Sequence, residues 1–215
     1  MGVLVEQIRT GGDRNFGYLC ADEATGAAFA VDPSFSPDVV AETATRKGWC
    51  LGYAFATHGH SDHTNGNEAF ERLTRLRVLL YGDRCPLTGI AVQHGAVFPL
   101  GNSSISILHT PGHTPDSICI QAGDALFTGD TLFVGKVGGT WSDEDSRQEY
   151  HSLHDRVMAL PEQFRVFPGH DYGTRPSSTI GEEKKSNPFL LQPDVEAFID
   201  LKANWAAYKK AHGIA

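Results

Sequence analysis

Three histidines and one aspartate fall within residues 58–63, in the order His-x-His-x-Asp-His. If the chain is extended here, residues two apart point the same way, so His58 and His60 can bind one metal ion. Asp62 and His63 are adjacent and diverge, so they suit a second ion beside the first. Zinc, iron and manganese all accept imidazole and carboxylate ligands. The spacing therefore predicts a metal site.

Three later clusters, each at the predicted end of a strand, supply the further ligands that a metal site needs. His113 lies at the apex of a loop restricted by two Gly/Pro turns. Asp130 follows a buried run and Gly129, which lets the backbone turn close to an ion. Because a carboxylate has two oxygens, Asp130 can bridge two cations, and His170 would complete the second site. Other polar residues of these clusters are expected to support the ligands: His109, Asp116 and Asp171.

The hydrophobic pattern around these clusters predicts alternating strands and helices. Strands are expected at residues 3–9, 16–21, 27–31, 51–56, 78–81, 103–109, 117–121, 125–128 and 165–167. Helices are expected at 37–47, 65–73, 146–159 and 194–211, and a capping box at 179–182 opens a further short helix. Two sheets with helices on their outer faces would bury these strands on both sides. We therefore expect a layered α/β fold with a helical C-terminal extension.

Composition and charge exclude several classes of protein. The 215 residues can bury a sizeable core, and the net charge of −8 argues against a nucleic-acid binder. No apolar stretch approaches the 18 residues of a membrane span, and no signal-peptide pattern opens the chain, so a cytoplasmic location is expected. The four cysteines form no C-x-x-C pair, which favours structural thiols.

In their order along the chain, the histidine and aspartate clusters resemble the motifs of the metallo-β-lactamase superfamily. These motifs are T-H-G-H-S-D-H, P-G-H-T, F-T-G-D-T-L-F and P-G-H-D-Y-G. Over residues 14–190 the chain is similar to the glyoxalase II (hydroxyacylglutathione hydrolase) branch and to its neighbours, the persulfide dioxygenases. The resemblance implies an αββα sandwich, in which residues 1–190 form the catalytic domain and residues 191–215 a C-terminal helix packed on it.

The resemblance also assigns the ligands by position. The first metal would be held by His58, His60, His113 and Asp130. The second would be held by Asp62, His63, Asp130 and His170. Asp62 and Asp130 are the expected catalytic carboxylates. Two divalent ions are implied, zinc in the first place, although iron and manganese fit the same ligands.

Such a centre predicts hydrolysis. Two ions would lower the pKa of a water towards ~7 and direct a metal-bridged hydroxide at a carbonyl carbon. A thioester suits this chemistry because its leaving thiolate needs no strong general acid. The expected function is therefore a dinuclear hydrolase that cleaves a small-molecule thioester or related ester.

The substrate pocket departs from the family pattern. Glyoxalase II and persulfide dioxygenases usually carry Gly-Cys-Gly-Lys or Gly-Cys-Gly-Arg after the bridging aspartate, and the basic residue helps to bind glutathione. Here residues 134–139 read Val-Gly-Lys-Val-Gly-Gly, so Gly139 occupies the basic position. The expected substrate contacts are Lys136, three residues earlier, and Tyr172, which matches a glutathione-contacting tyrosine of the family. Two late lysines are expected to be solvated: Lys209 and Lys210. A glutathione conjugate therefore stays one option among thioesters.

Several alternatives share this ligand set. A mononuclear non-haem iron persulfide dioxygenase would use His58, His113 and Asp130, but the absent Gly-Cys-Gly-Arg segment favours a hydrolase. A lactonase would combine the same ligands with a different pocket. The acidic charge disfavours a tRNA-processing nuclease. His60 disfavours a flavodiiron oxidoreductase, which typically has Glu there, and the complete ligand set disfavours a non-catalytic member.

Overall fold

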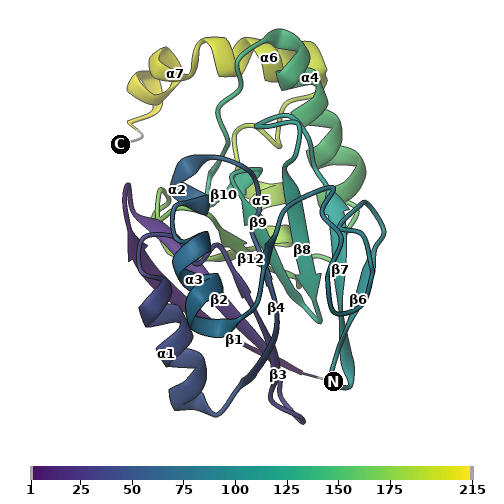
Figure 1. Cartoon of the computed structure of the whole chain (residues 1–215). Helices are drawn as coiled ribbons and strands as arrows, with labels where there is room; N and C mark the ends of the chain where they lie inside the picture. Colours follow the sequence, from purple (N-terminus) through teal and green to yellow (C-terminus); the bar gives the residue numbers. More distant parts are fainter. Residues whose placement is uncertain (1, 214–215) are drawn as a thin grey trace.

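Two β-sheets pack against each other in the computed structural model, which describes residues 2–213 (Figure 1). The first sheet has the strand order β1 (Val3–Gly11), β2 (Asn15–Asp22), β3 (Ala27–Val31), β4 (Cys50–Phe55) and β5 (Val78–Leu79). The second has the order β13 (Ser178–Thr179), β12 (Arg165–Pro168), β9 (Ala125–Gly129), β8 (Ile118–Ala122), β7 (Ser103–His109) and β6 (Val97–Leu100). A separate hairpin pairs β10 (Leu132–Phe133) with β11 (Lys136–Val137).

Aromatic side chains fill the space between the sheets. Phe127 of the second sheet packs against Tyr18 and Phe29 of the first, with ring centroids 5.1 and 5.7 Å apart. All three side chains are fully buried, which stabilises the fold by about 1.5–3 kcal/mol for each large apolar group. This core fixes the relative position of the two sheets and therefore of the loops at their ends.

Helices cover the outer face of each sheet. Apolar residues of α1 (Pro37–Lys47) and α3 (Asn67–Thr74) pack on the first sheet. The second sheet is covered by α4 (Asp143–His151) with its π-helical continuation η1 (Ser152–Val157), by α5 (Ile180–Ser186) and by α6 (Val195–Ala203). Figure 1 shows α6 and α7 (Trp205–His212) along one end of the molecule, beside α4. The layers confirm the predicted αββα sandwich with a helical C-terminal extension.

The differences from the predicted elements have local causes. The helix expected at 194–211 is broken at Asn204, whose side chain donates to the Asp200 carbonyl (3.0 Å) and competes with the helix backbone. The helix expected at 146–159 begins at Asp143 and becomes π-helical at Ser152. Strand β6 was not predicted; it lies at a sheet edge and contains Pro99, which weakens the sequence signal for a strand.

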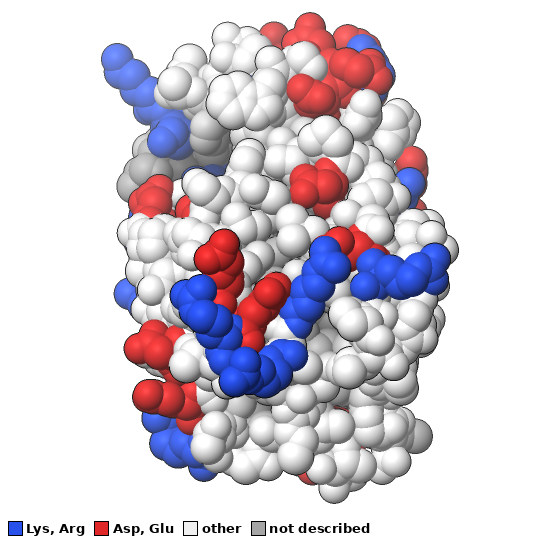
Figure 2. Space-filling model, in the orientation of Figure 1, with Lys and Arg blue, Asp and Glu red and all other residues white. Residues whose placement is uncertain are grey.

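The surface charges, the helix lengths and the thiols can be described from the structure. Figure 2 shows acidic side chains among basic ones in the middle of one face. Among residues 2–213, no helix has the length and apolar character that a membrane crossing requires. All four cysteines lie in this range and are free; three are buried and Cys50 is exposed.

Candidate metal centre

Strand ends from both sheets bring the predicted ligands to one edge of the sandwich. In the first sheet β3 and β4 run parallel, so Asp32 and the 58–63 segment follow their carboxyl ends side by side. In the second sheet β9 and β12 also run parallel, and Asp130 and His170 follow them. The β7–β8 loop contributes His113. These candidate ligands therefore lie where strands end, as the sequence predicted.

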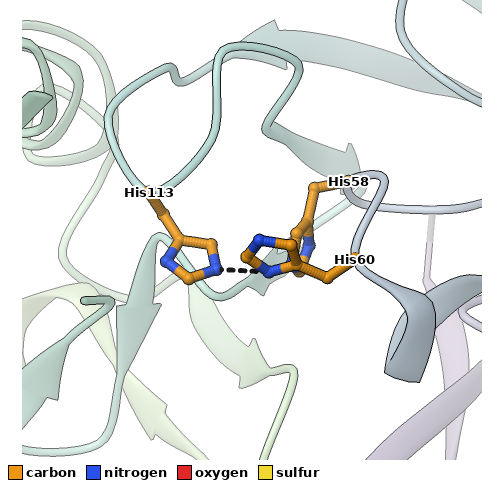
Figure 3. Close-up of side chains that lie close together, drawn as sticks. All are labelled: His58, His60 and His113. Carbon is orange, nitrogen blue, oxygen red and sulfur yellow. Dashed lines mark hydrogen bonds between the residues drawn. The ribbon is translucent and has the colours of Figure 1, made fainter. Parts of the chain in front are cut away.

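The first donor group consists of His58, His60 and His113. Nδ1 of His60 lies 3.0 Å from Nε2 of His58 and 3.0 Å from Nε2 of His113. Figure 3 shows His113 reaching from its own loop towards the other two side chains. His58 is buried, whereas His60 and His113 are partly exposed.

The second donor group consists of Asp62, His63 and His170. The one-turn helix α2 (Ser61–Thr64) presents Asp62 and His63, so both point inward from a helix rather than from an extended segment. Nε2 of His63 and Nε2 of His170 lie 3.2 Å apart, and each lies within 3.5 Å of Oδ2 of Asp62. His63 and His170 are buried.

Asp130 lies between the two groups. Its Oδ2 is 3.6 Å from Nε2 of His113 and 3.4 Å from Nε2 of His170. Its Oδ1 is buried and has no hydrogen-bond partner among the described residues. A buried carboxylate oxygen without a hydrogen-bond partner is costly in an otherwise satisfied structure, so this atom suits a metal ligand.

The outer nitrogens of the histidines are already occupied. Nδ1 of His113 donates to the carbonyl of Gly139 (2.7 Å), and Nδ1 of His170 donates to the carbonyl of Asp13 (2.8 Å). Since a carbonyl only accepts, both Nδ1 atoms carry the proton and both Nε2 atoms present lone pairs inward. Nδ1 of His63 donates to the Asp32 carboxylate in the same way (2.9 Å).

These observations fit a pair of divalent ions. Tetrahedral metal–nitrogen bonds of 2.0–2.1 Å would place ligand nitrogens ~3.3 Å apart. Nδ1 of His60 lies 3.0 Å from Nε2 of His58 and of His113, and Nε2 of His63 lies 3.2 Å from Nε2 of His170. Carboxylate and neutral imidazole are a donor set for zinc, iron or manganese.

The charges of the site support the same conclusion. Burial lowers the pKa of His58 well below its usual value, and His63 adds to that shift. Burial opposes protonation of His63, but the carboxylates of Asp32 and Asp130 outweigh burial and raise the pKa of His63. Burial would also raise the pKa of Asp130, yet the neighbouring imidazoles of His170 and His63 hold it well below its usual range. Asp130 is therefore an anion, as a cation ligand must be.

Two residues at the centre were not predicted to act there. The fully buried carboxylate of Asp32 accepts from the backbone N–H (2.7 Å) and Oγ1 (2.8 Å) of Thr57 as well as from His63. Asn15 donates through Nδ2 to Oδ2 of Asp62 (3.0 Å). Asp32 directly follows the apolar strand β3 and precedes Pro33, a context that is equally typical of a turn residue, so no local signal identified it.

Of the supporting residues expected from the sequence, two have other partners. Nε2 of His109 donates to the carbonyl of Pro115 (2.8 Å), and its ring stacks on Tyr81. Asp171 forms an ion pair with Arg9. The third, Asp116, lies close to Gly59 in the histidine loop: a Cβ atom at Gly59 would be 3.0 Å from its carboxylate.

A cavity of about 540 Å³ opens beside the centre and is lined by His113 and Asp130. A neighbouring cavity of about 590 Å³ shares three of its wall residues, Lys136, Tyr172 and Trp205. Nζ of Lys136 lies 3.9 Å from the centroid of the Tyr172 ring. Burial lowers the pKa of Lys136, and nearby cations add to this shift. The two residues predicted to contact substrate therefore border both cavities.

One expectation about this pocket was wrong. Lys209, which was expected to be solvated, is partly buried and lines the cavity of about 590 Å³. Lys210 is exposed, as expected.

Comparison with known proteins gives a family-level match. The profile described as "Metallo-beta-lactamase superfamily" matches residues 22–170. A protein named hydroxyacylglutathione hydrolase, from Nitrosococcus oceani, is 38% identical over 178 residues, which are 79% of this chain and 67% of the relative. A probable polyketide biosynthesis zinc-dependent hydrolase, BaeB from Bacillus velezensis, is 30% identical over 87% of each chain.

Solved structures give the same result. The crystal structure of ETHE1 from Myxococcus xanthus superposes with a TM-score of 0.83 at 33% identity and covers 94% of this chain and 91% of that one. A metallo-beta-lactamase from Staphylococcus aureus superposes with a TM-score of 0.81 at 26% identity, covering 93% and 66%. The family and fold expected from the motifs are thereby confirmed.

Proposed function

The chain belongs to the metallo-beta-lactamase superfamily, and we propose that it is a metal-dependent hydrolase that cleaves a thioester or a related ester. The observation that carries this proposal is the convergence of two donor groups on one carboxylate, Asp130, at the wall of a cavity.

The ligands assigned from the motifs are the residues that would hold the two ions. The first ion would be held by His58, His60, His113 and Asp130. The second would be held by Asp62, His63, His170 and Asp130. When bound, such ions lower the pKa of a water and polarise a carbonyl group. The relative BaeB, which is named a zinc-dependent hydrolase, favours zinc in this role, and iron and manganese accept the same ligands.

The cavity walls would orient the substrate. His113 and Asp130 mark the place where the reacting carbonyl must lie, because they are the ligands that line the cavity. The ammonium groups of Lys136 and Lys209 form no ion pair among the described residues, so they can bind a carboxylate on the thiol side of the substrate. A glutathione thioester has such carboxylates and is the substrate class that the relatives named hydroxyacylglutathione hydrolase suggest.

The alternative function, a mononuclear iron dioxygenase acting on a persulfide, would need only His58, His113 and Asp130. It leaves the second donor group without a role, although that group is as closely assembled as the first. The complete second group therefore favours hydrolysis by two ions.

Metal content and two assays on one sample test the proposal. Protein purified without added metal should contain about two equivalents of zinc, iron or manganese and should release free thiol from a glutathione thioester. One equivalent of iron together with oxygen uptake on glutathione persulfide, and no thioester cleavage, would establish the dioxygenase instead. Two ions with cleavage of lactones alone would establish a lactonase.

A variant tests the role of Lys136. Lys136→Ala should raise KM several-fold for a glutathione thioester, because its anion contact is lost, and should leave KM unchanged for a thioester of an uncharged thiol. The exposed Lys210→Ala serves as control. Equal KM changes for both substrates would rule out an anion contact at Lys136.

A further inference from the structure

A buried ion pair joins the C-terminal extension to the second helical layer. Lys202 of α6 donates to Glu149 of α4, and their side chains are 10% and 0% exposed. Burial raises the pKa of Glu149 to about 7 although the ammonium lies beside it. Its Oε1 has no partner among the described residues. Two charges are removed from water here at a considerable desolvation cost, so the pair calls for an explanation.

On one side the pair contacts the segment that orients His113. Nζ of Lys202 donates to the carbonyl of Gly138 (2.7 Å), and the next carbonyl, that of Gly139, accepts from Nδ1 of His113 (2.7 Å). A Cβ atom at Gly138 would lie 3.0 Å from Nδ1 of His113 and 2.1 Å from the carbonyl oxygen of Asp130. The peptide that Lys202 binds is therefore packed directly against the ring of the ligand.

On the other side helix α4, at the backbone of Glu149, contacts the loop that carries His113. A Cβ atom at Gly112 would lie 2.4 Å from Cα of Glu149, so the loop backbone rests on α4 at this residue. Ser152, three residues further along, donates to the carbonyl of Pro111 (2.7 Å). Glu149 and Lys202 thus hold the two segments between which the imidazole of His113 lies.

We propose that the Lys202–Glu149 pair positions His113 for the first metal ion, which makes helix α6 part of the metal site. This inference rests on the proposed function for the presence of the ion. The residues act on the metal through the 138–139 peptide and the 111–113 loop; Lys202 also lines the cavity beside the centre, so metal binding is measured without substrate. Loosening them should weaken the first ion more than the second, because the contacts of the pair within residues 2–213 lead to the peptide and the loop on either side of His113.

A second ion pair between the same helices gives a matched control. Arg147 of α4 binds Glu196 of α6 (2.8 Å), but the two side chains are 37% and 73% exposed and contact no part of the metal centre. If Lys202 only fastens α6 to α4, Arg147→Met and Lys202→Met should have the same effect. If Lys202 positions His113, only Lys202→Met should change metal binding.

The test is a titration of the metal-free protein with Zn²⁺ against a chelating dye, without substrate, followed by absorption spectra with Co²⁺. Lys202→Met should weaken the first ion about 10–100-fold, as loss of an outer partner of a ligand does, and should change the Co²⁺ spectrum. Lys202→Arg should retain most of the affinity. Titrations of His60→Ala, which should lose the first ion, and of His170→Ala, which should lose the second, serve as references that identify the ion lost from Lys202→Met.

A double variant separates positioning from stability. Lys202→Met with Glu149→Leu replaces both charges by apolar groups and should recover stability to denaturant but not first-ion affinity. The inference is overturned if Lys202→Met or the double variant binds the first ion with wild-type affinity. It is also overturned if Arg147→Met loses as much first-ion affinity as Lys202→Met, or if His113→Ala leaves metal binding unaltered. Wild-type protein that binds two ions but cleaves no thioester would count against the proposed function alone.

Discussion

The first and second donor groups meet at Asp130, yet different parts of the chain hold them. The second group is supported by residues of the first 32 positions: Asp32 binds His63, the Asp13 carbonyl binds His170 and Asn15 binds Asp62. In the first group, His113 depends on the Gly139 carbonyl and, through it, on α4 and α6. The second group therefore belongs to the N-terminal framework, and the first is completed by segments that come late in the chain.

The two groups also differ in what they face. The cavity beside the centre is lined by His113 and Asp130, whereas no ligand unique to the second group lines it. The histidines of the second group, His63 and His170, are 0% and 3% exposed at their side chains, against 11% for His113 of the first group, although Asp62 of the second group is 37% exposed. The difference suggests a division of roles, in which the first group meets the substrate and the second provides a fixed base for the shared carboxylate.

The largest effect on metal binding is expected from substitution of Asp130, which lies against both donor groups. Asp130→Ala should remove both ions together, because Asp130 is the carboxylate that lies against both groups. Since loss of an outer partner alone costs 10–100-fold, we expect kcat/KM to fall more than ~10³-fold. Elemental analysis after dialysis measures the loss, with the exposed Asp155→Ala as control. If the Asp130→Ala variant retains either ion, Asp130 is not a ligand that both donor groups require.

The next largest effects are expected from substitutions of ligands that belong to only one donor group. His60→Ala should release chiefly the first ion and His170→Ala chiefly the second, since each residue contacts a different group. Chelator titration should show one tight ion left in each variant. Equal loss of both ions from both variants would mean that the centre is one cooperative site.

The ligands were predictable because they lie in short segments with a local signal. His58, His60, Asp62 and His63 are near in sequence, and Asp130 and His170 each follow an apolar strand and a glycine. The hydrophobic periodicity of strands and helices is also a local signal, so it predicted most of the strands. Those at 27–31 and 103–109 have the predicted bounds.

The supports were not predictable because their partners are remote. Asp32 has the sequence context of a turn before proline, and only the parallel pairing of β3 with β4 shows that it faces His63. Glu149 and Lys202 are separated by 53 positions on helices whose polar faces look ordinary in sequence. The helix break at Asn204 depends on a side-chain hydrogen bond that propensity does not reveal.

Substitution of Asp32, which binds the candidate ligand His63, should have a smaller effect than substitution of a ligand itself. Asp32→Asn removes the charge that binds His63 and disturbs two hydrogen bonds from Thr57. We expect second-ion affinity to fall about 10–100-fold and the free energy of unfolding of the metal-free protein to fall by about 2–3 kcal/mol. Denaturant unfolding and zinc titration measure the two effects. Selective loss of the first ion would reverse the assignment of Asp32 to the second group.

Asn15→Ala tests the weakest support. Its side chain donates to Oδ2 of Asp62 (3.0 Å), while its backbone pairs with His170 and stays in place when the side chain is cut. Second-ion affinity should fall about 10-fold, at the lower end for an outer partner, because Asp62 is 37% exposed and water can replace the amide. Asn65→Ala is the matched control: Asn65 directly follows helix α2, which carries Asp62, but its side-chain oxygen accepts from the backbone N–H of Phe35. If Asn15→Ala weakens the first ion as much as the second, the N-terminal framework supports both groups, and the contrast between them rests on His113 alone.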